Sequence, residues 1–227
     1  DADVTVTLRW GVNSGFFSVE GNLMLIEAMS KQGAGVCATI YRLNLVLVVA
    51  GAAVFFGEEL SWWRYGGVAL AVLAVLGFLP DDGDSGAVRG TGLALVIVAA
   101  VFRAGMGLSY KEAFLLGADR NGIVLVNAAM WVVGGLGYAL GRERNFTALK
   151  QAKLWGYGTL SGVLVAGIVI FMALALQYGE AAVVLPIAQM SFLATFGLSV
   201  WLLHERVTPV KLAALGAGGL ALLLLSV

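Results

Sequence analysis

Three ionisable side chains lie inside long apolar stretches of the chain: Glu20, Arg42 and Arg103. On membrane-insertion scales a charged group at the centre of a helix costs about 2.5 kcal/mol or more, so each of these residues is a candidate for a functional role. Asn13, Glu20 and Glu27 recur every seven residues, which places them along one helix face, and we expect this face to point into a helical bundle. Glu20 could carry a coupling proton there, whereas a salt bridge to Arg42 or Arg103 is the structural alternative.

The elements that must position these residues are transmembrane helices. Of the 227 residues, 60% are hydrophobic and 12% are charged, whereas soluble domains contain about 45–50% apolar and about 25% charged residues. Apolar runs recur at the length of about 20 residues that a helix needs to cross the hydrocarbon core. We predict eight spans: Trp10–Met29, Ala34–Phe56, Trp62–Leu79, Thr91–Leu116, Ile123–Leu140, Leu154–Tyr178, Ala181–Leu203 and Pro209–Val227. The fold class is therefore an all-α membrane protein, a polytopic helical bundle.

An internal repeat organises these spans. A shift of 147 positions aligns residues 10–79 with 157–226 without a gap, and eleven positions are identical. The polar and small matches are the informative ones in so apolar a chain: Gly11/Gly158, Ser14/Ser161, Gly15/Gly162 and Glu58/Glu205. We call residues 10–79 copy one and residues 157–226 copy two.

Copy two is preceded by two spans, Thr91–Leu116 and Ile123–Leu140, that have no counterpart before copy one. We expect an N-terminally truncated chain that lacks about sixty residues, or two spans. Residues 1–79 would then be the last three helices of a first repeat, 80–90 a loop, and 91–227 a complete second repeat. With five of ten spans in each, the repeats are inverted, an architecture of transporters whose site lies near the membrane midplane.

The repeat places polar residues of the two copies at matching depth. The 147-residue shift aligns Arg42 with Gln189 and Asn44 with Ser191. A cavity between the copies explains why both helices carry polar groups there. The predicted substrate pathway contains Glu20, Arg42, Asn44, Arg103, Gln189 and Ser191. Weaker candidates are Tyr41, Asn127, Trp131 and Gln177, and packing or interfacial anchoring is the favoured interpretation of the two aromatic ones.

Both copies end in a similar segment before a glycine-rich span. Copy one has Phe56-Gly57-Glu58-Glu59-Leu60-Ser61, and copy two has Leu203-His204-Glu205-Arg206-Val207-Thr208. The chain thereby resembles the EamA-like branch of the drug/metabolite transporter superfamily, whose halves each end in a similar glutamate, hydrophobe, Ser/Thr signature. Val184-Leu185-Pro186 is similar to the leucine-proline element of that family, although copy one has Thr39 where Pro186 falls.

The signature has a structural interpretation that we prefer to direct contact with substrate. Ser61 and Thr208 are suitable N-cap residues, and Pro209 suits the first helical position. Glu58 and Glu205 are expected to end the preceding helices at the membrane surface. The structural signature thus consists of Glu58, Ser61, Pro186, Glu205, Thr208 and Pro209.

Several other classes of protein are disfavoured. Every Asp lies in a loop or at a span end, and the only histidine, His204, lies at the end of a span, so a membrane-embedded enzyme lacks its usual catalytic groups. Phosphate-binding motifs are absent, and 14 basic residues balance 14 acidic ones, which leaves no footprint for nucleic acid. The single cysteine, Cys37, cannot form an intrachain disulfide.

The sequence therefore predicts a secondary transporter that moves a small organic metabolite or drug-like compound by alternating access, with export as one direction. A channel is the first alternative and a membrane-embedded enzyme the second. The expected partners are the lipid bilayer, a small-molecule substrate and, as a candidate, a second copy of the chain in a homodimer; no cofactor is expected. The expected location is the bacterial inner membrane, in a multi-pass arrangement. Lys and Arg counts place the side opposite the C-terminus in the cytoplasm, whereas the family resemblance implies the reverse, so orientation stays open.

Overall fold

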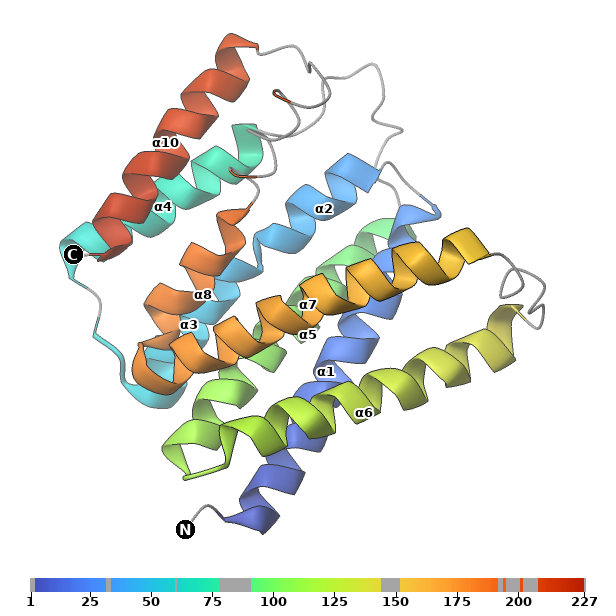
Figure 1. Ribbon diagram of the computed structural model, residues 1–227. Coiled ribbons are helices and arrows are strands. Elements are labelled where there is room, and N and C mark those ends of the chain that lie inside the picture. Colours follow the sequence, from blue (N-terminus) through green and yellow to red (C-terminus); the bar gives the residue numbers. More distant parts are fainter. Residues whose placement is uncertain are drawn as a thin grey trace. The chain divides into compact units, whose positions relative to one another are not determined.

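The computed structural model describes residues 3–31, 34–59, 61–77, 91–143, 152–191, 194, 201 and 208–226. Within these residues the chain is helical and contains no strand, which confirms the all-α class (Figure 1). The helices are α1 (Val4–Met29), α2 (Ala34–Arg42), α3 (Asn44–Phe56), α4 (Trp62–Gly77), α5 (Thr91–Leu115), α6 (Arg120–Tyr138), the π-helix η1 (Ala139–Glu143), α7 (Ala152–Tyr178), α8 (Ala181–Gln189) and α10 (Pro209–Ser226). They form two compact units, and the boundaries between these units fall within α1 and α5. Unit 1 is Asp1–Val19 with Ser109–Tyr178, and unit 2 is Glu20–Leu108 with Gly179–Val227.

Three of the described helices are long and apolar enough to cross a membrane: Thr91–Leu115, Arg120–Arg142 and Leu154–Tyr178. Three further apolar helices are shorter, namely Ile40–Phe56, Trp62–Gly77 and Leu212–Leu225. Large apolar side chains such as Val163 and Phe171 of α7 are exposed. Such surfaces are unusual in a protein surrounded by water, whereas lipid accepts them. The helices are therefore compatible with a membrane protein.

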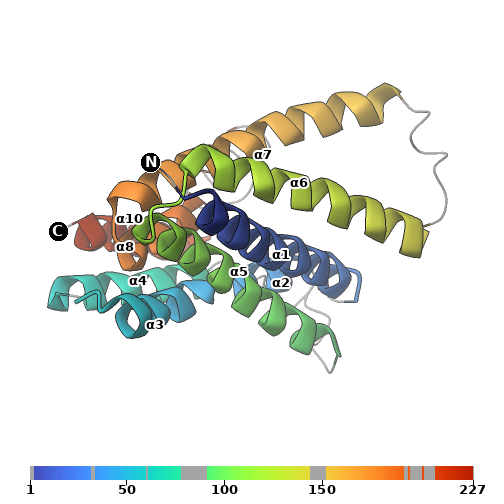
Figure 2. The same ribbon diagram turned by 90° about the horizontal axis from the view of Figure 1, so that it is seen from below.

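In unit 1, α1 and α6 lie side by side in both views (Figures 1 and 2) and run parallel. Their contacts repeat every fourth residue, in the order Thr7/Gly122, Gly11/Val126, Gly15/Met130 and Val19/Gly134. Residue numbers rise together along both helices, and the spacing of four is that of ridges packed into grooves. Glycine is needed at this contact, because a Cβ atom on Gly15 would lie 2.7 Å from the Cβ of Met130. Small residues thus bring these two helices together.

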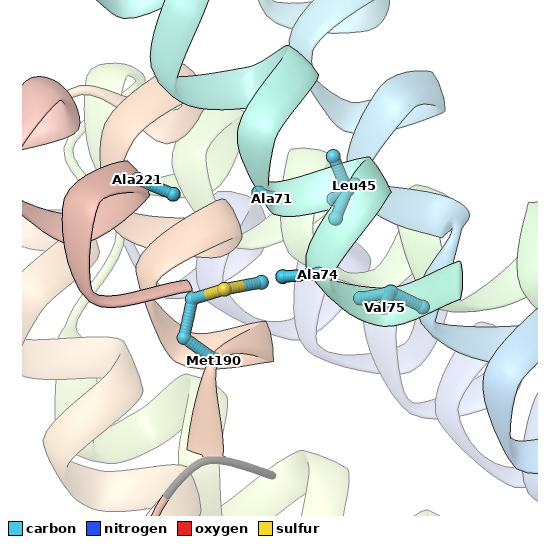
Figure 3. Close-up of a cluster of buried hydrophobic side chains, with 6 residues drawn as sticks. All are labelled: Leu45, Ala71, Ala74, Val75, Met190 and Ala221. Carbon is cyan, nitrogen blue, oxygen red and sulfur yellow. The ribbon is translucent and has the colours of Figure 1, made fainter. Parts of the chain in front are cut away.

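In unit 2, α4 and α10 pack antiparallel and are related by the 147-residue shift. Gly67 of α4 contacts Leu224 of α10, and Gly77 contacts Ala214. The shift turns the first of these pairs into the second, so the contact is reciprocal, as it is around a two-fold axis. Beside it lies a core cluster of Leu45, Ala71, Ala74, Val75, Met190 and Ala221, in which the Met190 side chain points toward Ala74 (Figure 3).

Over the predicted span Ala34–Phe56 the chain is helical except at one residue, Leu43, which separates α2 from α3. The Leu43 amide bonds to the carbonyl of Ile40 at 3.1 Å, three residues back rather than four. In copy two, α8 ends at the equivalent place, and the Met190 amide bonds to the carbonyl of Ile187 at 3.0 Å. α2 and α8 each contain nine residues and begin at positions 147 apart. The two copies therefore break their helices in register.

Proline does not explain this shared break, because Pro186 lies inside α8 while Thr39 occupies the equivalent place in α2. At the break in copy one, Nδ2 of Asn44 donates a hydrogen bond of 2.7 Å to the backbone oxygen of Tyr41. A side-chain amide that bonds to the backbone competes with the helical ladder. The side chain of Asn44 thus bonds to the Tyr41 carbonyl at the break, in place of a helical backbone amide. Most of the expected span from Met190 to Leu203 lies outside the described residues.

Candidate functional site

The two helix breaks meet through a pair of amide side chains in unit 2. Nε2 of Gln189, the last residue of α8, donates a hydrogen bond of 3.1 Å to Oδ1 of Asn44, the first residue of α3. Asn44 is 1% exposed, so this contact is shielded from solvent. Two of the predicted pathway residues, one from each copy, are therefore in contact.

The other two predicted residues of this group flank the same breaks. Arg42 is the last residue of α2 and is half-buried, and Ser191 directly follows the break at Met190 and is exposed. Each side of the junction thus presents a polar residue before and after the break. Amide groups, a hydroxyl and a guanidinium can donate hydrogen bonds to a carboxylate or carbonyl oxygen of a small molecule.

Arg103 lies on α5. Its Nη1 atom donates to the sulfur of Met106 at 3.0 Å, a weak acceptor for a guanidinium group. Tyr41, a weaker candidate from the sequence, directly precedes Arg42 on α2 and packs against the core cluster of Ala28, Cys37 and Val96.

Glu20 lies at the contact between α1 and α5. A Cβ atom on the next residue, Gly21, would lie 3.1 Å from Phe102 Cβ and 3.6 Å from the backbone nitrogen of Arg103. Glu20 itself is partly buried. A salt bridge from Glu20 to Arg42 or Arg103 stays a prediction.

The remaining weaker candidates stabilise unit 1 instead. Asn127 is 2% exposed, and its Nδ2 atom lies 3.5 Å from Oγ of Ser14 on α1. Nε1 of Trp131 donates to Oγ of Ser18 at 2.9 Å. Both bonds cross the α1/α6 contact, as expected for packing residues. Gln177 accepts a hydrogen bond of 3.1 Å from Nη1 of Arg120, at the end of α7.

Glu58 has a role that differs from the expectation. α3 ends at Phe56, and Gly57 turns the backbone with φ 64°. The two carboxylate oxygens of Glu58 then accept hydrogen bonds from the amides of Ala181 at 2.9 Å and Ala182 at 2.8 Å. These are the first residues of α8, so Glu58 caps the start of a helix in the other copy. Glu180, at the N-cap position of α8, makes no side-chain cap bond of its own.

The other signature residues agree with the structural interpretation. Oγ of Ser61 accepts from the amide of Arg64 at 3.4 Å, at the start of α4. Thr208 directly precedes α10, whose first residue is Pro209, and its carbonyl accepts from the amide of Leu212 at 3.0 Å. Glu205 lies outside the described residues.

Comparison with known proteins identifies the fold alone. The sequence matches no family model and no curated protein. The structure is similar to a chain in a solved crystal structure described only as a protein, with a TM-score of 0.77 and 13% sequence identity. The likeness covers 96% of this chain and 76% of that chain. Nearly all of the chain therefore adopts a fold that occurs in a solved structure, and that structure says nothing about activity.

Proposed function

We propose that the protein is a multi-pass secondary transporter of a small organic compound, of the EamA-like kind that its sequence resembles, in a bacterial inner membrane. The observation that carries the proposal is the contact between Asn44 and Gln189. Interrupted helices from two repeats that meet through polar side chains are the usual way in which transporters build a binding site inside a membrane. Broken helices are tolerated at that depth only where they are buried in protein or line a cavity.

The reciprocal packing of α4 and α10 supports an inverted repeat. These helices are equivalent under the 147-residue shift and run antiparallel. A two-fold axis perpendicular to both helices relates such a pair, and in a membrane that axis lies in the bilayer plane. Alternating access follows when the copies exchange conformations around a shared site.

We further propose a full architecture of ten spans. Copy one lacks counterparts of α5 and α6 in the present chain. α7 carries the equivalents of the α1 residues that pack on α6, yet Gly158 and Gly162 have no described atom within 4 Å of an added Cβ. A helix equivalent to α6 would cover this face of α7.

A transport assay distinguishes this function from a channel. The full-length protein would be reconstituted in liposomes and screened with labelled amino acids, nucleosides, sugars and organic cations. A transporter shows saturable uptake and counterflow, in which unlabelled substrate inside the liposome drives labelled substrate inward. Saturation without counterflow, or flux that rises linearly with concentration, would count against alternating access.

Glu20 is our candidate for the proton-coupling residue. Glu20 is partly buried and lies inside an apolar helix, where an acidic group is by default a candidate for proton relay. We expect Glu20→Gln to abolish substrate-driven proton flux while counterflow, which needs no net proton movement, persists. Glu27→Gln, on the same face of α1, is the matched control. Normal proton flux in Glu20→Gln liposomes would remove the coupling role.

A further inference from the structure

The end of the helices at which α3 stops and α8 starts carries two charged contacts between the copies. Copy one provides Glu58 and Arg64, and copy two provides Glu180 and the amides of Ala181 and Ala182. We propose that these contacts form a latch that favours one of the two states of the transporter. The inference rests on the proposed function, because the latch acts on alternating access.

The capping half of the latch is partly buried and charge-assisted. Ala181 and Ala182 are 0% and 1% exposed, so water has little access to the amides that Glu58 accepts from. A carboxylate that bonds two amides at a helix N-terminus is favoured by both the hydrogen bonds and the helix dipole. Separation of the copies at this end would leave these amides without their acceptor, unless water entered.

The ionic half of the latch joins α4 to the N-cap of α8. Nη1 of Arg64 pairs with Oε2 of Glu180. The Arg64 side chain is 22% exposed and that of Glu180 is 47% exposed, so added salt can screen the pair. Because Glu180 does not cap its own helix, its carboxylate is available for Arg64 while Glu58 caps α8.

The 147-residue shift gives the Arg64–Glu180 ion pair no equivalent in the other copy. The 147-residue shift maps Glu58 onto Glu205, so a carboxylate is present in both copies. It maps Arg64 onto Lys211, but it maps Glu180 onto Gly33, which has no side chain. In alternating access, contacts at one end of the helices are exchanged for equivalent contacts at the other end. The ion pair therefore stabilises only the state in which Arg64 and Glu180 are joined, and this state should predominate without substrate.

The test measures how often this end opens. In the full-length protein in liposomes, with Cys37→Ser as background, Ala182→Cys provides a thiol that a maleimide reagent reaches only when the copies separate. Arg64→Gln and Glu180→Gln should each raise the labelling rate about two- to fivefold, the range for a partly exposed ion pair. Glu58→Gln should raise it about tenfold, since two partly buried charge-assisted bonds are weakened and the N–H₂ group of the new amide opposes a backbone N–H. Val183→Cys is a second reporter if Ala182→Cys does not fold.

Two controls separate a latch from a general loss of packing. The charge-reversed pair Arg64→Glu with Glu180→Arg should return the labelling rate toward that of the parent, and Arg120→Gln should leave the rate unchanged. High salt should speed labelling of the parent but not of Arg64→Gln. Unchanged rates in both Arg64→Gln and Glu180→Gln, or failure of the reversed pair to restore the parent rate, would overturn the proposal. Labelling needs no substrate, so this result is independent of whether a transport activity is found.

Discussion

α1 and α7 carry the same short pattern but meet different surroundings. Gly11, Ser14 and Gly15 of α1 are buried, and the two glycines face Val126 and Met130 of α6. The equivalents in α7 are Gly158, Ser161 and Gly162, which are exposed in the described structure. Both segments are helical. The pattern therefore specifies a face for close packing, and the helix forms whether or not that face is covered.

The proposed membrane location would account for this difference. In water, an apolar helix without a partner would be driven to bury its surface, whereas hydrocarbon tails would solvate it. Helices in a membrane are held together by close contact and by hydrogen bonds across the contact, and α1 makes both kinds of contact with α6. Substitutions at equivalent or comparable positions should therefore lower the free energy of unfolding more at the α1/α6 contact than on the exposed face of α7.

The largest difference is expected at the second glycine. Gly15→Ile should destabilise the protein by about 1–3 kcal/mol, because its Cβ would lie 2.7 Å from the Cβ of Met130 and one helix must move away. Gly162→Ile in the present chain should change stability by less than about 0.5 kcal/mol, since no described atom is near. Thermal unfolding in detergent measures both. Equal losses in the two variants would show that the α7 face is already covered, and a costly Gly162→Ile only in a longer protein would reveal its covering helix.

A smaller difference is expected between two aromatic residues, one on α6 and one on α7. Trp131→Phe removes the 2.9 Å bond to Ser18 across the α1/α6 contact and should cost about 1 kcal/mol. Tyr157→Phe, at an exposed position of α7, should change stability by less than about 0.5 kcal/mol. The free energy of unfolding in detergent, measured for both variants, provides the comparison. A loss from Tyr157→Phe as large as that from Trp131→Phe would contradict the account.

The smallest difference is expected at the serines. Ser14 bonds to the Gly11 carbonyl at 3.1 Å and lies 3.5 Å from Nδ2 of Asn127, so Ser14→Ala should cost about 0.6 kcal/mol, the average for such bonds between membrane helices. Ser161→Ala should be neutral. A double variant, Ser14→Ala with Asn127→Ala, should lose less than the sum of the single variants. Strict additivity would mean that the two side chains do not interact.

The helices could be predicted from the sequence, because long apolar runs are a local signal. The start of α4 at Trp62 and the end of α7 at Tyr178 agree with the prediction. The break at Leu43 was missed because the usual signal, a proline, is absent there and Asn44 supplies the competing bond. A single polar residue in an apolar run does not distinguish a helix break from a binding group.

The candidate site was predicted in part. Matching positions in the repeat indicated that Asn44 and Gln189 would be near each other, and they are in contact. The capping role of Glu58 was missed because its partners, Ala181 and Ala182, lie more than a hundred residues away and contribute only backbone amides. Because almost every residue has a backbone amide, the residue types do not indicate which amides a carboxylate will bind. Charges such as Glu20 and Arg103 inside apolar runs mark candidate positions, but whether they pair depends on the reach of their side chains, which sequence spacing does not specify.

The contact between Asn44 and Gln189 tests the account most directly, through counterflow of the identified substrate in liposomes. Asn44→Ala and Gln189→Ala should each lower the rate about tenfold or more, and the double variant should be little worse than either one, because both remove the same junction. Gln177→Ala, which removes an amide at the end of α7, should retain the parent rate. Parent-like counterflow in both single variants, with folding intact, would contradict a substrate site at the helix breaks.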